Sequence, residues 1–152
     1  WCVNNGRAVR VAEYYYSGRG SSCMKTDEEY YQEIVKLAGG REIQNIVVDP
    51  SAASFIEVLK RKGWRVKKAD NDVLGGIRLT SDALKEGRIV ICEGCNDCIR
   101  EMDEYVWDLS SEAKDRVKKE HDHAMDDMRY FVSTVLREGN TAVAACSVER
   151  KT

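Results

Sequence analysis

The stretch NIVVDPSA, residues 45–52, decides the fold. Ile46, Val47 and Val48 form a short apolar run without alternation, which is typical of a β-strand buried on both faces of a sheet. Asp49 ends this strand. Pro50, the only proline of the chain, opens the helix that follows, because its fixed φ suits a first helical turn. A buried strand that passes directly into a helix predicts an α/β sheet flanked by helices.

The rest of the chain continues this alternation. WCVNNGRAVRV, residues 1–11, predicts a β-hairpin around an Asn-Asn-Gly turn, with its second strand over residues 7–16. Thr26 and Glu29 form a capping box at one helix start, and Asp72 caps another. Further strands are expected over residues 64–69 and 88–92, and helices over residues 26–38, 50–62, 72–85, 96–107 and 120–138. We expect one domain spanning residues 1–152.

Composition narrows the class of protein. Of 152 residues, 43% are hydrophobic and 33% charged, as in a soluble globular domain, and the net charge of −2 gives no general basic field for nucleic acid. Because no apolar stretch approaches the roughly 18 residues of a membrane span, no membrane partner is expected and we predict a cytoplasmic protein. Of the six cysteines, Cys92, Cys95 and Cys98 have a spacing that would suit a structural zinc ion, but free thiols are the favoured interpretation.

Acidic residues occur at the positions where α/β sheets usually have their ligand sites. Ligand sites of α/β sheets lie at the carboxyl ends of strands, and Asp49 ends the buried strand. In KKEHDHAMDDMRY, residues 118–130, His123 and Asp126 are three apart and Asp122 and Asp126 four apart, so both pairs share one helix face. Crowded carboxylates need a cation, and carboxylate and imidazole ligands suit Mg²⁺ or Mn²⁺. Two such ions are the recurring device for phosphodiester hydrolysis.

A second interpretation of the aspartates is open at this point. Acidic side chains in a first helical turn interact favourably with the helix dipole, so Asp122 and Asp126 would also suit a solvated helix N-terminus. The His123–Asp126 spacing, with Asp49 at a strand end, favours the metal site.

Four blocks of the chain, in this order, resemble the C-terminal nuclease domain of tailed-bacteriophage large terminase subunits. They are EYYYSGRGSSCMKTDEEYYQEI (13–34), IVVDPSAASFIEVLKRKGWRVKKADNDVLGGIR (46–78), NDCIREMDEYVWD (96–108) and KKEHDHAMDDMRYF (118–131). The resemblance implies a ribonuclease H-like fold. It also implies a metal-dependent endonuclease that cuts concatemeric viral DNA during genome packaging, in the cytoplasm of a bacterial host.

The site residues follow by position from this resemblance. Asp49, His123 and Asp126 are implied as catalytic residues and as ligands of Mg²⁺ or Mn²⁺, with Asp122 as a supporting ligand. A further set of basic residues is implied to meet DNA phosphates: Lys67, Lys68, Arg78, Lys118 and Lys119. The implied partners are double-stranded DNA, the terminase ATPase domain, the small terminase subunit and the portal.

The chain departs from the family pattern in two ways. Family members carry another catalytic aspartate on a first strand that lies ahead of residue 1, so we expect a sheet without that strand. The resemblance implies a two-ion site, and with that acid missing a single ion is the alternative. Glu13 is a weaker candidate to replace that acid. No G-x-x-x-x-G-K-[ST] motif is present, so the ATPase domain is absent from these residues. The missing strand also predicts an exposed edge over residues 7–16, through which two copies would pair.

Two alternatives to an endonuclease remain. One is a catalytically incomplete module that binds DNA or the portal without cutting. The other is a structural domain stabilised by zinc at the three closely spaced cysteines.

Overall fold

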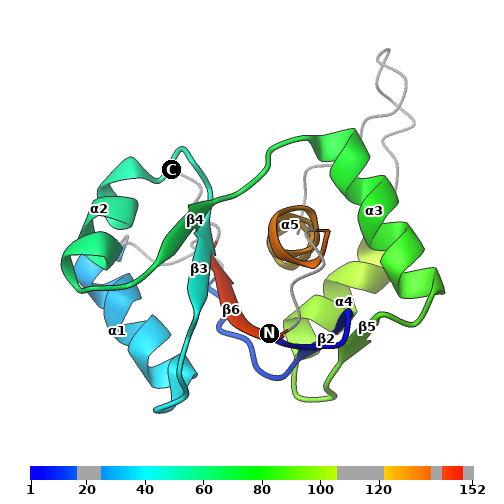
Figure 1. Ribbon diagram of the computed structural model, residues 1–152, viewed down its shortest axis with the longest axis horizontal. Helices are drawn as coiled ribbons and strands as arrows, with labels where there is room; N and C mark the ends of the chain where they lie inside the picture. Colours follow the sequence, from blue (N-terminus) through cyan, green and yellow to red (C-terminus); the bar gives the residue numbers. More distant parts are fainter. Residues whose placement is uncertain (17–24, 106–121, 138–141, 149–152) are drawn as a thin grey trace.

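The computed structural model describes residues 1–16, 25–105, 122–137 and 142–148. Within them, six strands form one mixed sheet in the order β4-β3-β6-β1-β2-β5 (Figure 1). The strands are β1 (Cys2–Asn4), β2 (Arg7–Arg10), β3 (Asn45–Val48), β4 (Val66–Lys68), β5 (Ile89–Ile91) and β6 (Ala142–Val148). The helices are α1 (Asp27–Ala38), α2 (Ala53–Arg61), α3 (Val73–Lys85), α4 (Asn96–Glu104), α5 (His123–Phe131) and the π-helix η1 (Val132–Leu136). None of these described helices has the length and apolar character to cross a membrane.

The helices form a layer on each face of the sheet. α1 and α2 pack together on one side, and α3 and α4 pack around α5 on the other (Figure 1). β3 explains this arrangement, because successive strand residues point to opposite faces. Ile46 and Val48 pack with Phe55 of α2, whereas Val47 joins the second core with Phe131 of α5. The predicted burial of this strand on both faces is confirmed.

β1 and β2 form the predicted hairpin, with Asn5 and Gly6 at φ values of 48° and 74°. Both lie in the left-handed region that a two-residue turn of this type requires. The second strand ends at Arg10, however, and lies between antiparallel β1 and parallel β5. The prediction that residues 7–16 form an exposed edge is therefore wrong, because the backbone of β2 is paired on both sides. The outer strands of the described sheet are β4 and β5.

Helix boundaries follow local chemistry where a cap is present. The Glu29 N–H donates to Thr26 Oγ1 at 3.3 Å and the Thr26 N–H donates to Glu29 Oε2 at 2.7 Å, which confirms the capping box. Gly39, at φ 56°, ends α1. Asp72 caps α3 by accepting from the Gly75 N–H at 3.1 Å.

Three predicted helices differ in extent. α2 begins at Ala53, because the preceding residues form a turn in which the Ala52 N–H donates to the Asp49 carbonyl at 3.0 Å. α5 begins at His123 and passes into a π-helical segment at Val132; residues 120, 121 and 138 of the expected helix lie outside the described residues. α4 ends at Glu104, and residues 106 and 107 are likewise outside.

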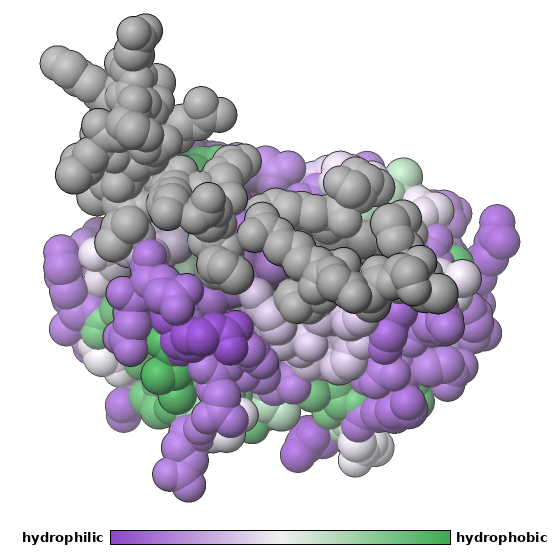
Figure 2. All heavy atoms as spheres, turned by 180° about the vertical axis from the view of Figure 1, so that it is seen from behind, coloured by the Kyte–Doolittle hydropathy of each residue, from purple (hydrophilic) through white to green (hydrophobic). Residues whose placement is uncertain are grey.

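The face seen in Figure 2 is predominantly hydrophilic where it is coloured. Exposed large apolar side chains are spread over several elements, with Val35 on α1, Leu74 on α3, Val90 on β5 and Ile99 on α4. Apolar side chains scattered in this way are ordinary for a globular surface.

Candidate active site at the carboxyl end of β3

Asp49 follows the last residue of β3 and lies where the sheet meets α5. Its Oδ1 accepts a hydrogen bond of 2.8 Å from the Ser51 N–H, and its Oδ2 accepts one of 2.6 Å from the Tyr130 hydroxyl on α5. Partial burial alone would raise the pKa of Asp49, but these hydrogen bonds and the nearby Arg129 guanidinium hold that pKa below its usual value. Asp49 is therefore a carboxylate at neutral pH, oriented by a neighbouring helix.

Asp126 lies on α5, one turn before Tyr130, and is only 9% exposed. Its Oδ1 accepts a hydrogen bond of 3.0 Å from Arg129 Nη2. Burial, the bond to Asp49 and the charges of Asp49 and Asp126 together raise the pKa of the Tyr130 hydroxyl. The phenol therefore stays protonated at neutral pH and lies close to both carboxylates. Asp49 and Asp126 thus both lie near the Tyr130 hydroxyl at one corner of the domain, and the metal site predicted for them stays a prediction.

Asp122 and His123 begin α5 and occupy different surroundings. Asp122 is the N-cap residue and is 4% exposed. The His123 ring meets the edge of the Tyr15 ring, with centroids 6.0 Å apart. The burial of Asp122 and Asp126 excludes the interpretation that they form a solvated helix end. His123 is partly exposed and packs beside an aromatic ring at the start of the helix.

The number of donors limits what this corner can bind. Within the described residues, no group of three or more histidine, cysteine, aspartate or glutamate side chains is placed to hold a metal ion. Asp49 and Asp126 supply carboxylate oxygens from two elements. Mg²⁺ commonly binds through one or two carboxylates and keeps several waters, so two ligands of this chemistry fit one such ion. The pair does not by itself fit a site for two ions.

A buried ionic network around Arg10 was not predicted from the sequence. Arg10 of β2 donates a hydrogen bond from Nη1 to Asp127 Oδ2, and its Nη2 lies 3.5 Å from Glu13 Oε2. Burial alone would lower the pKa of Arg10, but the charges of Asp127 and Glu13 and the hydrogen bond to Asp127 act together against it, so that pKa is raised. The network joins β2 to α5.

Two glutamates cap the helices that support the site. Glu13 accepts hydrogen bonds from the Asp97 N–H at 2.7 Å and the Cys98 N–H at 3.1 Å, at the start of α4. Glu101 is fully buried and accepts from the Ala124 N–H at 2.6 Å, at the start of α5. Carboxylates at helix N-termini satisfy donors that lack partners within the helix. The structure thus places Glu13, the weaker candidate for the predicted metal site, at the start of α4 as a helix cap.

The cysteine cluster forms part of the second core. Cys95 and Cys98 are buried free thiols, and Cys92 is a partly buried one. Burial raises the pKa of Cys98 to about 12 and also raises that of Cys95, so both remain protonated at neutral pH. The Cys95 thiol donates to the Arg10 carbonyl at 3.5 Å. These surroundings favour the free-thiol interpretation over zinc.

The predicted DNA-binding residues are only partly placed together. In the parallel pairing of β3 with β4, Lys68 stands opposite Val48, directly before Asp49. The carboxyl ends of the two strands, with Lys67 and Lys68 on β4, therefore lie side by side. Arg78 is exposed on α3. Lys118 and Lys119 lie outside the described residues.

The α/β sheet covered by helices on both faces agrees with the comparisons with known proteins. The chain belongs to the terminase RNase H-like domain family, whose model matches residues 2–134. The fold class and the family resemblance predicted from the sequence are confirmed.

Solved and curated relatives agree with this assignment. The large terminase of a thermophilic bacteriophage, solved in complex with ADP, is 42% identical with a TM-score of 0.83, over 88% of this chain and 35% of that one. A second crystal form of the same phage protein gives a TM-score of 0.81. The terminase large subunit of Escherichia phage T5 is 25% identical over 130 residues, 82% of this chain and 30% of that protein. The chain thus spans about a third of the length of the relatives it matches.

Proposed function

We propose that this domain is the metal-dependent endonuclease of a phage terminase large subunit and hydrolyses DNA phosphodiester bonds during genome packaging. The observation that carries the proposal is the meeting of Asp49 from β3 and Asp126 from α5 beside the Tyr130 hydroxyl. Membership of the terminase RNase H-like family supports the same chemistry. Double-stranded DNA is the proposed substrate. The ATPase domain, small subunit and portal are the proposed partners, and a bacterial host cytoplasm is the proposed location.

Asp49 and Asp126 would hold the metal ion, Mg²⁺ or Mn²⁺. When bound, such an ion supplies an activated water and stabilises negative charge on phosphate oxygens. The Tyr130 hydroxyl, held protonated, orients Asp49 by donating to one of its oxygens and leaves the carboxylate charged. His123 is the first residue of α5 and lies one turn before Asp126. It would bind the metal ion or orient one of its ligands. Lys67 and Lys68, on the strand next to Asp49, would meet the DNA backbone.

The test is cleavage of supercoiled plasmid with Mn²⁺ or Mg²⁺. We expect nicking by the wild-type chain and its loss in Asp126→Asn, which keeps the size of the side chain. Asp103→Asn on α4, where the aspartate is exposed, is the matched control and should nick as the wild type does. Equal nicking by Asp126→Asn and the wild type would refute the site assignment.

A second candidate function is a DNA-binding module that does not cut. It is favoured by the donor count, since no group of three or more potential metal-ligating side chains lies together among the described residues. Such a module would retain plasmid in a mobility-shift assay with and without Mn²⁺ and leave it supercoiled. The same assay run on Asp126→Asn would then show unchanged DNA binding.

A further inference from the structure

We propose that Arg129 is a built-in counter-ion for Asp126, which a divalent cation has to displace before it binds at this corner. The inference rests on the metal site of the proposed function. Arg129 Nη2 lies 3.0 Å from Asp126 Oδ1, and the two side chains are only 5% and 12% exposed. A buried carboxylate left without a partner is strongly destabilising, so a buried cation beside it meets the same need as a metal ion.

The guanidinium is held in place but is not fully bonded. It lies over the Tyr130 ring, with its central carbon 4.6 Å from the ring centroid. Its Nε and Nη1 atoms are buried and have no hydrogen-bond partner in the described part of the chain. Buried donors of a purely structural arginine are normally satisfied, and each unsatisfied donor costs free energy. The bond to Asp126 is therefore the principal hydrogen bond of Arg129, which also contacts the Tyr130 ring and lies near the charge of Asp49.

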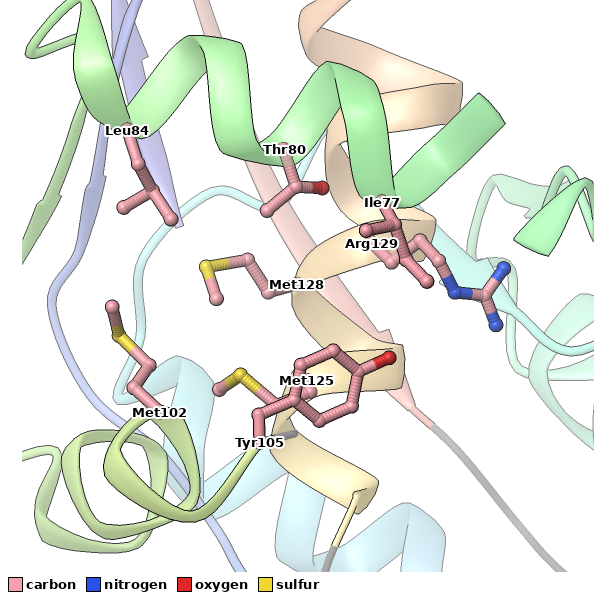
Figure 3. A pocket seen from close by; sticks show the side chains of 8 residues that line it. All are labelled: Ile77, Thr80, Leu84, Met102, Tyr105, Met125, Met128 and Arg129. Atoms are coloured by element: carbon pink, nitrogen blue, oxygen red, sulfur yellow. The ribbon is translucent and has the colours of Figure 1, made fainter. Parts of the chain in front are cut away.

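Space beside Arg129 allows its side chain to move. Its aliphatic stem packs against Gly76 of α3, where an added Cβ would lie 2.5 Å from Arg129 Cγ. The stem also borders a cavity of about 150 Å³ between α3, α4 and α5, which is lined mainly by apolar side chains such as Met102, Met125 and Met128. Figure 3 shows the guanidinium pointing away from these methionines, with only the stem at the cavity. The empty volume gives the stem room to repack when the charged end releases Asp126.

Arg129 and a metal ion compete on two grounds. Both approach the same carboxylate, and their like charges repel each other within a buried region where screening is weak. The arginine thus keeps Asp126 paired in the absence of metal and lowers the affinity of the corner for a divalent cation. In this arrangement the acidic corner is stable without metal, and metal binding is coupled to a movement of Arg129.

The test measures Mn²⁺ affinity by calorimetry and thermal stability in EDTA, without any nuclease assay. Arg129→Met removes the charge, and its apolar side chain suits the neighbouring methionines. We expect a lower Tm in EDTA, because Asp126 loses a buried positive charge beside it, and Mn²⁺ binding at least about tenfold tighter than in the wild type. Arg137→Met is the matched control. Arg137 is exposed just after η1 and lies 3.9 Å from Asp70, so its loss should change neither quantity.

Arg129→Lys guards against a folding defect of the methionine variant. A lysine keeps the charge but holds a carboxylate less firmly than a guanidinium does, so its Mn²⁺ affinity should lie between those of the wild type and Arg129→Met. Mn²⁺ affinity that is unchanged, weaker or absent in the folded arginine variants overturns the inference. Tighter Mn²⁺ binding without plasmid nicking by any variant supports it and contradicts the endonuclease proposal. Nicking by the wild type, with unchanged Mn²⁺ affinity in Arg129→Met, supports the endonuclease proposal and contradicts the counter-ion role of Arg129.

Discussion

The hydroxyl of Tyr130 donates a hydrogen bond of 2.6 Å to Asp49, and this bond joins α5 to the carboxyl end of β3. The two residues are 81 positions apart in the chain, so the bond holds together two segments of the candidate site that are distant in sequence. It fixes one oxygen of Asp49 while the Ser51 N–H fixes the other. A carboxylate held at both oxygens keeps one orientation before any ligand arrives.

Removal of this hydroxyl should therefore loosen the site. We expect Tyr130→Phe to lower the free energy of unfolding by about 1 kcal/mol, since a hydrogen bond to a partly exposed carboxylate is lost. Urea unfolding at pH 7 measures this. Tyr31→Phe is the matched control, because the Tyr31 ring, rather than its hydroxyl, contacts Lys62. A loss of equal size in both variants would show that the Tyr130 bond has no special weight.

The same bond predicts a dependence on pH. The folded-state pKa of Asp49 is lowered, so the stability it contributes is present above the unfolded-state pKa of about 3.9 and is lost as pH falls through the folded value. Tyr130→Phe removes one cause of that lowering. We therefore expect the stability difference between wild type and Tyr130→Phe to shrink as pH falls below about 4. Unfolding curves at pH 7, 5 and 3.5 measure it; a gap that widens in acid would contradict the assignment.

Local chemistry allowed much of this fold to be predicted. The strand that ends at Asp49, the capping box at Thr26 and the cap at Asp72 depend on neighbouring residues, and all three were predicted from the sequence. The shared helix face of Asp122 and Asp126 was equally local. Residues three or four apart on a helix face the same way wherever that helix packs.

The remaining features depend on contacts between distant residues. The Arg10–Asp127 pair joins residues 117 apart, and Glu101 caps α5 from 23 residues away. In both cases the sequence around one residue contains no pattern that indicates its distant partner. The error over residues 7–16 has the same origin, since pairing of β2 with β5 depends on a crossover through several elements. Arg129 was missed as well, because an arginine next to a tyrosine on a helix has no distinctive spacing.

Glu101 should control the position of the whole helix that carries Asp126. It accepts from the Ala124 and Met125 N–H groups and from the Tyr15 hydroxyl, which lies 2.6 Å away. Glu101→Gln keeps the shape but replaces a charged acceptor with an amide, whose NH₂ group must then meet a donor. We expect a loss of about 1–3 kcal/mol in the free energy of unfolding, measured with guanidinium chloride.

Glu104→Gln provides the control for that measurement. Glu104 is the last residue of the same helix, α4, and is exposed, so its substitution should change stability by less than about 0.5 kcal/mol. Glu101→Gln should also weaken Mn²⁺ binding, because α5 then holds Asp126 less rigidly. If Glu101→Gln is destabilised but binds Mn²⁺ as tightly as the wild type, the cap at the start of α5 does not affect metal binding by Asp126.

Gly76 tests how closely α3 must approach Arg129. A Cβ at this position would lie 2.5 Å from Arg129 Cγ, 2.9 Å from its Cδ and 3.0 Å from Ser133 Oγ. An alanine in a helix interior normally gains about 1 kcal/mol over glycine, but the overlap with Arg129 and Ser133 forces side chains of α5 and η1 to shift. We expect Gly76→Ala to destabilise the domain by about 1–3 kcal/mol.

Gly94→Ala, where an added Cβ meets nothing within 4 Å, should be close to neutral in the same thermal unfolding measurement. Stabilisation by Gly76→Ala would contradict this expectation, because the overlap with Arg129 and Ser133 would then cost less than alanine gains in helix propensity.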